Sequence, residues 1–178
     1  MNLQDNDFLI FGIEPRFAVD PAALQSRWKE LQSLAHPDKF ALQGAAEQRV
    51  AMQWSIRVNE AYQRLRDPIR RAAYLCELRG GAVGAETDTA MPPEFLQQQI
   101  EWREALEEAA DQAALDGLAE QVQESKARLL GECEHLLDEA PCTHEAAQRV
   151  RALMFVERFG HEVEEQLARM SRTPTGPA

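Results

Sequence analysis

Cysteine is scarce in this chain of 178 residues, and basic residues are outnumbered by acidic ones. The three cysteines, Cys76, Cys133 and Cys142, lie far apart and form no Cys-x-x-Cys pair. This argues against a disulfide framework or a zinc site and favours a reducing compartment. With 19 Lys and Arg against 30 Asp and Glu, the formal net charge is −11. Phosphate backbones and anionic lipids repel such a chain, so we expect neither nucleic acid nor a membrane surface as its main partner.

Long hydrophobic runs are also missing. No stretch approaches the roughly 18 apolar residues that span a bilayer. The run at 8–11 is too short for the core of a signal peptide, and Asp5 and Asp7 precede it where basic residues would be expected. The sequence starts at Met1 without an Arg-rich transit segment. These features together predict a cytoplasmic protein.

The composition that remains is typical of helices. Alternating β-branched and aromatic residues are nearly absent, whereas Ala, Leu, Gln, Glu and Arg dominate, so we predict an all-α protein. Asp20-Pro21 is a typical helix start, and Pro37 disfavours helical geometry at the residue before it. A second long helix is predicted from about residue 46. Its buried face is expected to carry Val50, Trp54, Val58, Ala61 and Leu65. The two helices predict an antiparallel hairpin.

Short helices are expected on either side of this hairpin. Leu9, Ile10 and Phe11 are predicted to form one that packs across an end, and another should begin at Asp67-Pro68 and end near Gly80. The hairpin and its flanking helices make up a predicted N-terminal domain, 1–79.

The second half of the chain has a different character. Residues 1–80 carry 11 basic and 10 acidic side chains (net +1), whereas residues 81–178 carry 8 and 20 (net −12), which indicates two different surfaces. The Gly-, Thr- and Pro-rich stretch 80–92 is the predicted linker. Three amphipathic stretches, 93–113, 114–139 and 143–170, predict a three-helix bundle over 93–171, with Leu136 among its core residues. The tail, 172–178, should be frayed.

The strongest motif lies in the loop of the hairpin. His36-Pro37-Asp38-Lys39 is followed by Asn59-Glu60-Ala61-Tyr62 and then by Asp67-Pro68 with Arg71-Ala72-x-Tyr74. In this order, on a helical hairpin, residues 5–78 resemble a J-domain, the module that stimulates DnaK-type chaperone ATPases. Without the resemblance, Pro37 still predicts a rigid turn, because its ring fixes φ and it has no N–H to donate.

The resemblance implies a contact surface for the chaperone ATPase. His36 and Asp38, held by Pro37, would engage the partner. Arg27 and Lys29, together with Lys39 beyond the turn, would dock on an acidic patch. Two other interpretations are a plain loop in which Asp38 caps a turn, and a hydrolase with His36 as base and Asp38 as its orienting group. The hydrolase interpretation has no positioned nucleophile, so we predict no catalytic residue and no enzyme.

The acidic bundle narrows the resemblance. The segments at 8–13 (FLIFGI), 36–40 (HPDKF) and 95–108 (FLQQQIEWREALEE) are similar to the HscB family of iron–sulfur assembly co-chaperones. The resemblance implies two partners, the iron–sulfur scaffold protein IscU and the dedicated DnaK-type chaperone HscA. It implies no cofactor. The scaffold-contacting positions it implies are Leu96, Ile100, Glu101, Glu104, Glu108 and Phe155, and Gln97 stands where a relative carries an apolar residue.

Helical geometry alone gives a compatible but less specific prediction. At about 100° per residue, Leu96 and Ile100 lie on the shoulder of their helix, beside the face that carries Glu101, Glu104 and Glu108. Phe155 lies roughly 100° from the centre of its buried stripe and is therefore predicted to be exposed. An apolar strip edged with carboxylates suggests a docking surface. The alternative is an edge of the core beside a solvated helix face.

Two further functions remain open at this stage. The bundle could bind a different client or serve in oligomerisation. An oxidase would need a metal site, and Glu132-x-x-His135 supplies half of a di-iron motif. Because no second Glu-x-x-His occurs, we predict no metal site.

Overall fold

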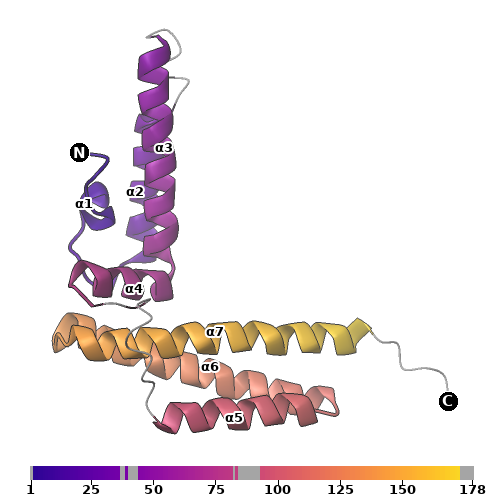
Figure 1. Cartoon of the computed structure of the whole chain (residues 1–178). Coiled ribbons are helices and arrows are strands. Elements are labelled where there is room, and N and C mark those ends of the chain that lie inside the picture. The colour runs from indigo at the N-terminus through magenta and orange to yellow at the C-terminus, as the bar shows by residue number, and fades with distance from the viewer. Residues whose placement is uncertain (1, 37–38, 40–43, 82, 84–92, 173–178) are drawn as a thin grey trace. The chain divides into compact units, whose positions relative to one another are not determined.

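The computed structural model describes all residues except 1, 37–38, 40–43, 82, 84–92 and 173–178. The described residues form helices and connecting segments without a strand, so the all-α prediction is confirmed. They divide into two units, Met1–Leu78 and Arg79–Ala178. The first unit contains α1 (Asp7–Phe11), α2 (Pro21–Leu34), α3 (Ala45–Arg66) and α4 (Pro68–Leu78) (Figure 1). The second contains α5 (Pro93–Glu108), α6 (Gln112–Glu134), the π-helical turn η2 (His135–Glu139) and α7 (Thr143–Arg172).

None of the described helices combines the length and the hydropathy that crossing a lipid bilayer requires. Most of the predicted linker, 80–92, and of the predicted tail, 172–178, lies outside the described residues.

The first unit is built on the predicted hairpin. Asp20 caps α2 through a hydrogen bond that its Oδ1 accepts from the backbone N–H of Ala22 (2.9 Å), and Pro21 is the first helical residue. α2 and α3 lie side by side, and α4 lies across the end of the hairpin that is away from its connecting loop (Figure 1). The buried side chains of the hairpin are Leu24, Leu31, Ala51, Val58, Ala61 and Leu65.

The predicted core of α3 extends too far toward the loop. Val50 is 51% exposed and Trp54 is half-buried, whereas Val58 further along the same stripe is buried. The reason is the position of α1, which lies beside the half of the hairpin nearer α4 (Figure 1). A helical stripe is buried only where another element covers it. α1 covers the part of α3 nearer α4 and does not extend along the helix as far as Val50.

A buried carboxylate that the sequence analysis missed holds α1 in this place. Asp7 is 0% exposed, and its carboxylate pairs with Arg57 (Oδ1 to Nη2, 2.7 Å) and with Arg64 (Oδ2 to Nη1, 3.0 Å) of α3. Its backbone N–H donates to the Tyr74 hydroxyl of α4 (3.1 Å), and Arg64 stacks over that ring. The pairing offsets the cost of removing the charge from water and ties three helices together. Ile10 and Phe11 are buried as predicted, but Leu9 is 59% exposed.

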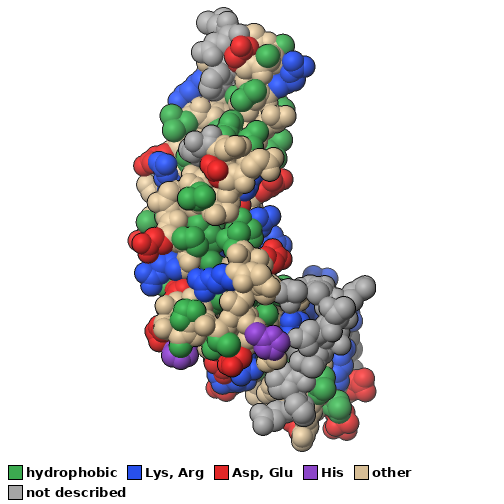
Figure 2. All heavy atoms as spheres, turned by 60° about the vertical axis from the view of Figure 1, so that its left-hand side comes forward, with side chains coloured by type: hydrophobic (Ala, Val, Ile, Leu, Met, Phe, Trp, Pro, Cys, Tyr) green, Lys and Arg blue, Asp and Glu red, His purple; other side chains and the backbone are tan. Residues whose placement is uncertain are grey.

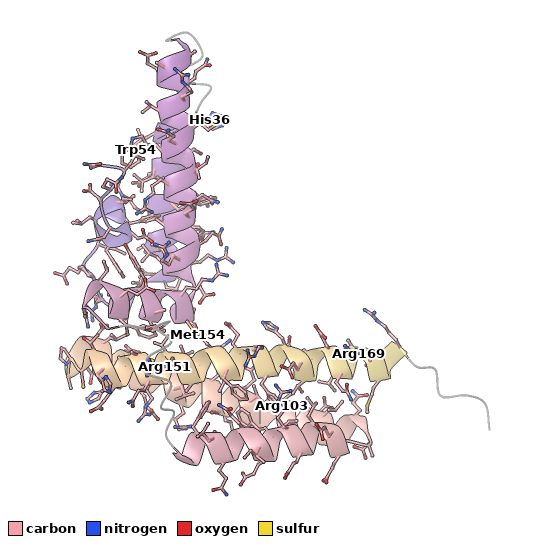
Figure 3. All side chains as sticks on the ribbon, in the orientation of Figure 1. His36, Trp54, Arg103, Arg151, Met154 and Arg169 are labelled. Carbon is pink, nitrogen blue, oxygen red and sulfur yellow. The ribbon has the colours of Figure 1, made fainter. Side chains whose placement is uncertain are left out.

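The second unit is the predicted three-helix bundle. The indole of Trp102 in α5 stacks on Phe159 of α7 with ring centroids 5.4 Å apart. Arg103, labelled in Figure 3, reaches from α5 to Glu162 of α7 (3.0 Å). The buried side chains of α6 include Leu115, Leu118, Val122, Leu129 and Cys133, and those of α7 include Val150, Leu153, Val156, Phe159 and Val163.

The first bundle helix is shorter than predicted. It ends at Glu108 instead of residue 113, because Asp111 caps the next helix and accepts a hydrogen bond from the backbone N–H of Ala114 (2.8 Å). Ala113 is therefore an exposed residue in the first turn of α6.

The end of α6 also departs from the prediction. Residues His135–Glu139 form a π-helical turn, closed by the hydrogen bond from the Ala140 N–H to the His135 carbonyl (2.9 Å). The wider turn changes the angle between successive side chains, so an extrapolation at 100° per residue fails there. Leu137 is buried (1% exposed) where the sequence predicts Leu136, which is only half-buried.

Candidate functional site

The tip of the hairpin presents His36 to solvent. Its side chain is exposed, and its carbonyl accepts a hydrogen bond from the backbone N–H of Lys39 (3.1 Å). Figure 3 shows His36 beside the hairpin, close to its loop end. Pro37 and Asp38 lie outside the described residues, so the rigid turn and the position of the Asp38 carboxylate stay predictions.

The three basic residues predicted to dock on the chaperone are not equivalent. Arg27 is half-buried, forms an ion pair with Glu30 (3.0 Å) and donates from Nε to the Phe11 carbonyl (3.3 Å). Its guanidinium is therefore engaged within the first unit, where its Nε joins α2 to α1. Lys29 and Lys39 are exposed, and the ammonium of Lys39 donates to Ser33 Oγ (3.2 Å). Of the three predicted docking residues, these two lysines therefore leave their charge more open to a partner.

Leu34 is an exposed residue at the tip that the sequence analysis did not single out. It is the last residue of α2, and its side chain is 65% exposed. At about 100° per residue it lies roughly 80° from the Leu24–Leu31 stripe, so helical geometry could have identified it.

The apolar strip on α5 lies where the sequence predicts. Leu96 is 46% exposed and Ile100 is 60% exposed, one helical turn apart. Large aliphatic side chains are costly to leave in water when they lie together, so this strip is a candidate docking surface.

Carboxylates edge the strip on one side. Glu101, Glu104 and Glu108 are exposed, and Glu101 accepts a hydrogen bond from the Gln97 amide (2.9 Å). Gln97 therefore orients a carboxylate and adds no apolar surface. The strip and these three glutamates are called the α5 surface below, and its chemistry suits a partner with aliphatic and basic side chains.

The prediction that Phe155 is exposed is wrong. It is 9% exposed, not exposed as its position on α7 suggested. Its ring meets Phe95 of α5 edge-on (centroids 5.6 Å apart) and stacks on Phe159 (6.0 Å). α7 contacts both α5 and α6, so its buried sector is wider than one stripe and includes a residue about 100° from the centre.

Glu132 and His135, the half of a di-iron motif, each pair with other side chains. The Glu132 carboxylate pairs with Arg128 (2.8 Å) and with Arg149 (2.5 Å), whereas His135 bonds to Glu139 (2.8 Å). No group of three or more potential metal ligands gathers within the part of the chain that the structure describes.

Comparisons with known proteins agree along nearly the whole chain. A family model described as "HSCB C-terminal oligomerisation domain" matches residues 91–164. A relative from Burkholderia multivorans, named co-chaperone protein HscB homolog, is 46% identical over 173 residues, which cover 96% of this chain and 98% of the relative.

Solved structures show the same two-part architecture. The chaperone HscB from Vibrio cholerae is 33% identical, with a TM-score of 0.80 over 93% of this chain and 99% of that one. The human co-chaperone protein HscB is 28% identical, with a TM-score of 0.82 over 97% of this chain and 85% of the human one.

Proposed function

The chain belongs to the HscB family of J-domain co-chaperones, and on that premise we propose that it links an iron–sulfur scaffold protein to a chaperone ATPase. The α5 surface binds the scaffold, IscU. The hairpin tip, with His36, Pro37 and Asp38, stimulates the ATPase of the dedicated DnaK-type chaperone HscA. Hydrolysis then fixes the chaperone on the scaffold and promotes transfer of the cluster to recipient proteins.

The observation that carries this proposal is the exposed strip on α5. Leu96 and Ile100 leave aliphatic surface in water on a helix whose other exposed side chains are mostly polar or acidic. Burying them on a partner is favourable by roughly 25 cal/mol per Å² of apolar area removed from water. The flanking glutamates add long-range attraction for a basic partner and speed its association.

The second unit thereby raises the local concentration of the scaffold near the chaperone. A partner held by one site reaches the other as an intramolecular event, so the two contacts act together without touching each other. The chain itself performs no chemistry in this scheme. Its place of action is the cytoplasm.

The experiment is a measurement of HscA ATP turnover with the chain, with IscU and with both. We expect stimulation by both together to exceed the sum of the separate effects. His36→Gln should abolish all co-chaperone-dependent turnover. Leu96→Ser with Ile100→Ser should abolish only the part that requires the scaffold, because these side chains are exposed and their loss leaves the core intact. Scaffold-dependent turnover that survives the double substitution would contradict the assignment of the α5 surface.

A second candidate function follows from the description of the matching family model, which names oligomerisation. A second copy could bury Leu96 and Ile100. A symmetric contact through the α5 surface would bring Glu101, Glu104 and Glu108 of two copies near one another. The repulsion between these carboxylates opposes such a dimer. Sedimentation equilibrium distinguishes the two: a dimer that the Leu96→Ser and Ile100→Ser pair dissociates would favour self-association. A different client would leave the chain monomeric and without affinity for IscU.

A further inference from the structure

The α5 surface continues onto α7, because two contacts hold these helices together in a fixed register. Phe95 of α5 meets Phe155 of α7 (ring centroids 5.6 Å apart), and further along the same helices Arg103 bonds to Glu162 (3.0 Å). Figure 3 shows Arg103 between the two helices. The paired residues differ by 60 and by 59 in residue number, so α5 and α7 run parallel. In this register Arg158 of α7 lies level with residues 98 and 99 of α5.

Arg158 lies on the same side of this helix pair as the apolar strip. It precedes Glu162 by one turn, at an angle of about 40° around α7. On α5, Leu96 and Ile100 lie about 20° and 60° around the helix from Arg103, which bonds to Glu162. Arg158 and the strip therefore flank the same contact between the two helices, one from each side.

The guanidinium of Arg158 is available to a partner. The side chain is exposed, and its Cζ lies over the Phe155 ring, 5.9 Å from the centroid. Among the described residues it forms no ion pair, whereas Arg103 on the facing helix pairs with Glu162. Contact with a ring holds a guanidinium in place and leaves N–H groups that can donate to a carboxylate.

The extended surface therefore carries three kinds of side chain in a fixed order. Glu101, Glu104 and Glu108 form one edge on α5, the aliphatic strip lies in the middle, and Arg158 forms the other edge on α7. Figure 2 shows hydrophobic, acidic and basic side chains next to one another on the described part of the second unit. A partner with the complementary order of charges fits in one orientation, because the reverse orientation brings like charges together.

We propose that Arg158 is a specificity-determining residue of this surface and pairs with a carboxylate of the scaffold. The inference rests on the proposed function, because it assumes that the scaffold binds the α5 surface. The bound segment then has aliphatic side chains over Leu96 and Ile100, basic ones toward the three glutamates and an acidic one toward Arg158. A guanidinium binds a carboxylate through two parallel N–H groups, so lysine should replace Arg158 only in part.

The test measures the affinity of IscU for the full-length chain by calorimetric titration, at low and at high salt. Arg158→Gln removes the charge, and Arg158→Lys keeps the charge without the planar fork. The matched control is Arg169→Gln, which removes the same charge from a 72% exposed side chain of the same helix. In the register described, Arg169 lies beyond the end of α5 at Glu108.

Arg158→Gln should weaken binding about tenfold at low salt and less at high salt, because salt screens an exposed ion pair. Arg158→Lys should fall between the wild type and Arg158→Gln, and the control should match the wild type. Unchanged affinity in Arg158→Gln would overturn the proposal. Tighter binding would overturn it too, since Arg158 would then face a basic part of the scaffold.

The Leu96→Ser and Ile100→Ser pair separates this proposal from the proposed function. If the pair abolishes binding while Arg158→Gln leaves it unchanged, only the role of Arg158 is wrong. If the pair leaves binding unchanged, the proposed function fails and the inference with it.

Two measurements on the free chain test the other roles of Arg158. If it serves only to hold Phe155 in the core, Arg158→Gln should unfold at a clearly lower temperature than the control and keep the salt dependence of wild-type binding. If it pairs with the glutamates of a second copy, the wild type should sediment as a dimer and Arg158→Gln as a monomer. Either result would overturn the proposal.

Discussion

Phe155 of α7 meets Phe95 of α5 edge-on, with ring centroids 5.6 Å apart and an interplanar angle of 85°. Phe95 immediately precedes Leu96 in the helix that carries the α5 surface. Phe155 is therefore a core residue that packs behind the helix carrying this surface. Its contribution to stability can be measured separately from the contribution of the exposed residues to binding.

Phe155→Ala should lower the free energy of unfolding by about 3 kcal/mol, because it removes a buried aromatic ring and leaves a cavity. Leu96→Ala, at a 46% exposed position, should change it by less than about 0.5 kcal/mol. Urea unfolding followed by circular dichroism measures both. Equal losses for the two variants would show that Phe155 does not fill the core in the way described.

The buried carboxylate of α1 gives a second prediction. Asp7→Asn should destabilise the first unit by about 3 kcal/mol, because Arg57 and Arg64 lose the charge that compensates theirs. Glu14→Gln, at an exposed position outside the helices, is the matched control and should be close to neutral. Thermal unfolding of both variants is the measurement. A neutral Asp7→Asn would mean that the two arginines reach water without cost.

Ser125 is expected to behave in the opposite sense. It is 5% exposed in the middle of α6, and its hydroxyl has no hydrogen-bond partner among the described residues. Ser125→Ala removes a buried polar group without leaving a donor or acceptor behind, so stability should rise by about 1 kcal/mol. Gln123→Ala, two residues away and exposed, controls for the helix propensity of alanine. A loss of stability in Ser125→Ala would reveal a hydrogen bond that the hydroxyl does make.

Two glycines of the bundle form a matched pair. A Cβ added at Gly117 meets no atom within 4 Å, whereas one added at Gly160 lies 3.2 Å from Val122 Cγ1. Gly117→Ala should therefore gain about 0.5–1 kcal/mol from helix propensity alone. In Gly160→Ala the close approach of α7 to α6 should offset that gain. Denaturant midpoints decide, and an equal gain at both positions would mean that the two helices separate easily.

Local rules predicted helix starts well but did not predict how much of each helix is covered. The start of α2 depends on Asp20 and Pro21, which act within one turn, and both were readable from the sequence. The exposure of Val50 depends on where α1 stops, and the burial of Phe155 depends on α7 touching two helices at once. Neither fact is local. Leu137 replaced Leu136 in the core because a π-helical turn shifted the register.

In the candidate site, too, local geometry predicts some features and not others. Leu96, Ile100 and the three glutamates follow from the angle of each residue around one helix, so their exposure could be predicted. The hydrogen bond from Arg27 to the Phe11 carbonyl depends on the docking of α1, which no periodicity indicates. The ion pair of Arg27 with Glu30, by contrast, joins residues three apart on one helix.

The central claim is that one chain must hold the scaffold and stimulate the chaperone at the same time. The direct measurement adds an excess of the His36→Gln variant to wild-type chain, HscA and a limiting amount of IscU, and follows ATP turnover. The variant should bind the scaffold without stimulating the ATPase, so turnover should fall toward the level seen without scaffold. Addition of Leu96→Ser and Ile100→Ser to the same variant should remove this inhibition. Turnover that the His36→Gln variant leaves unchanged would contradict the account.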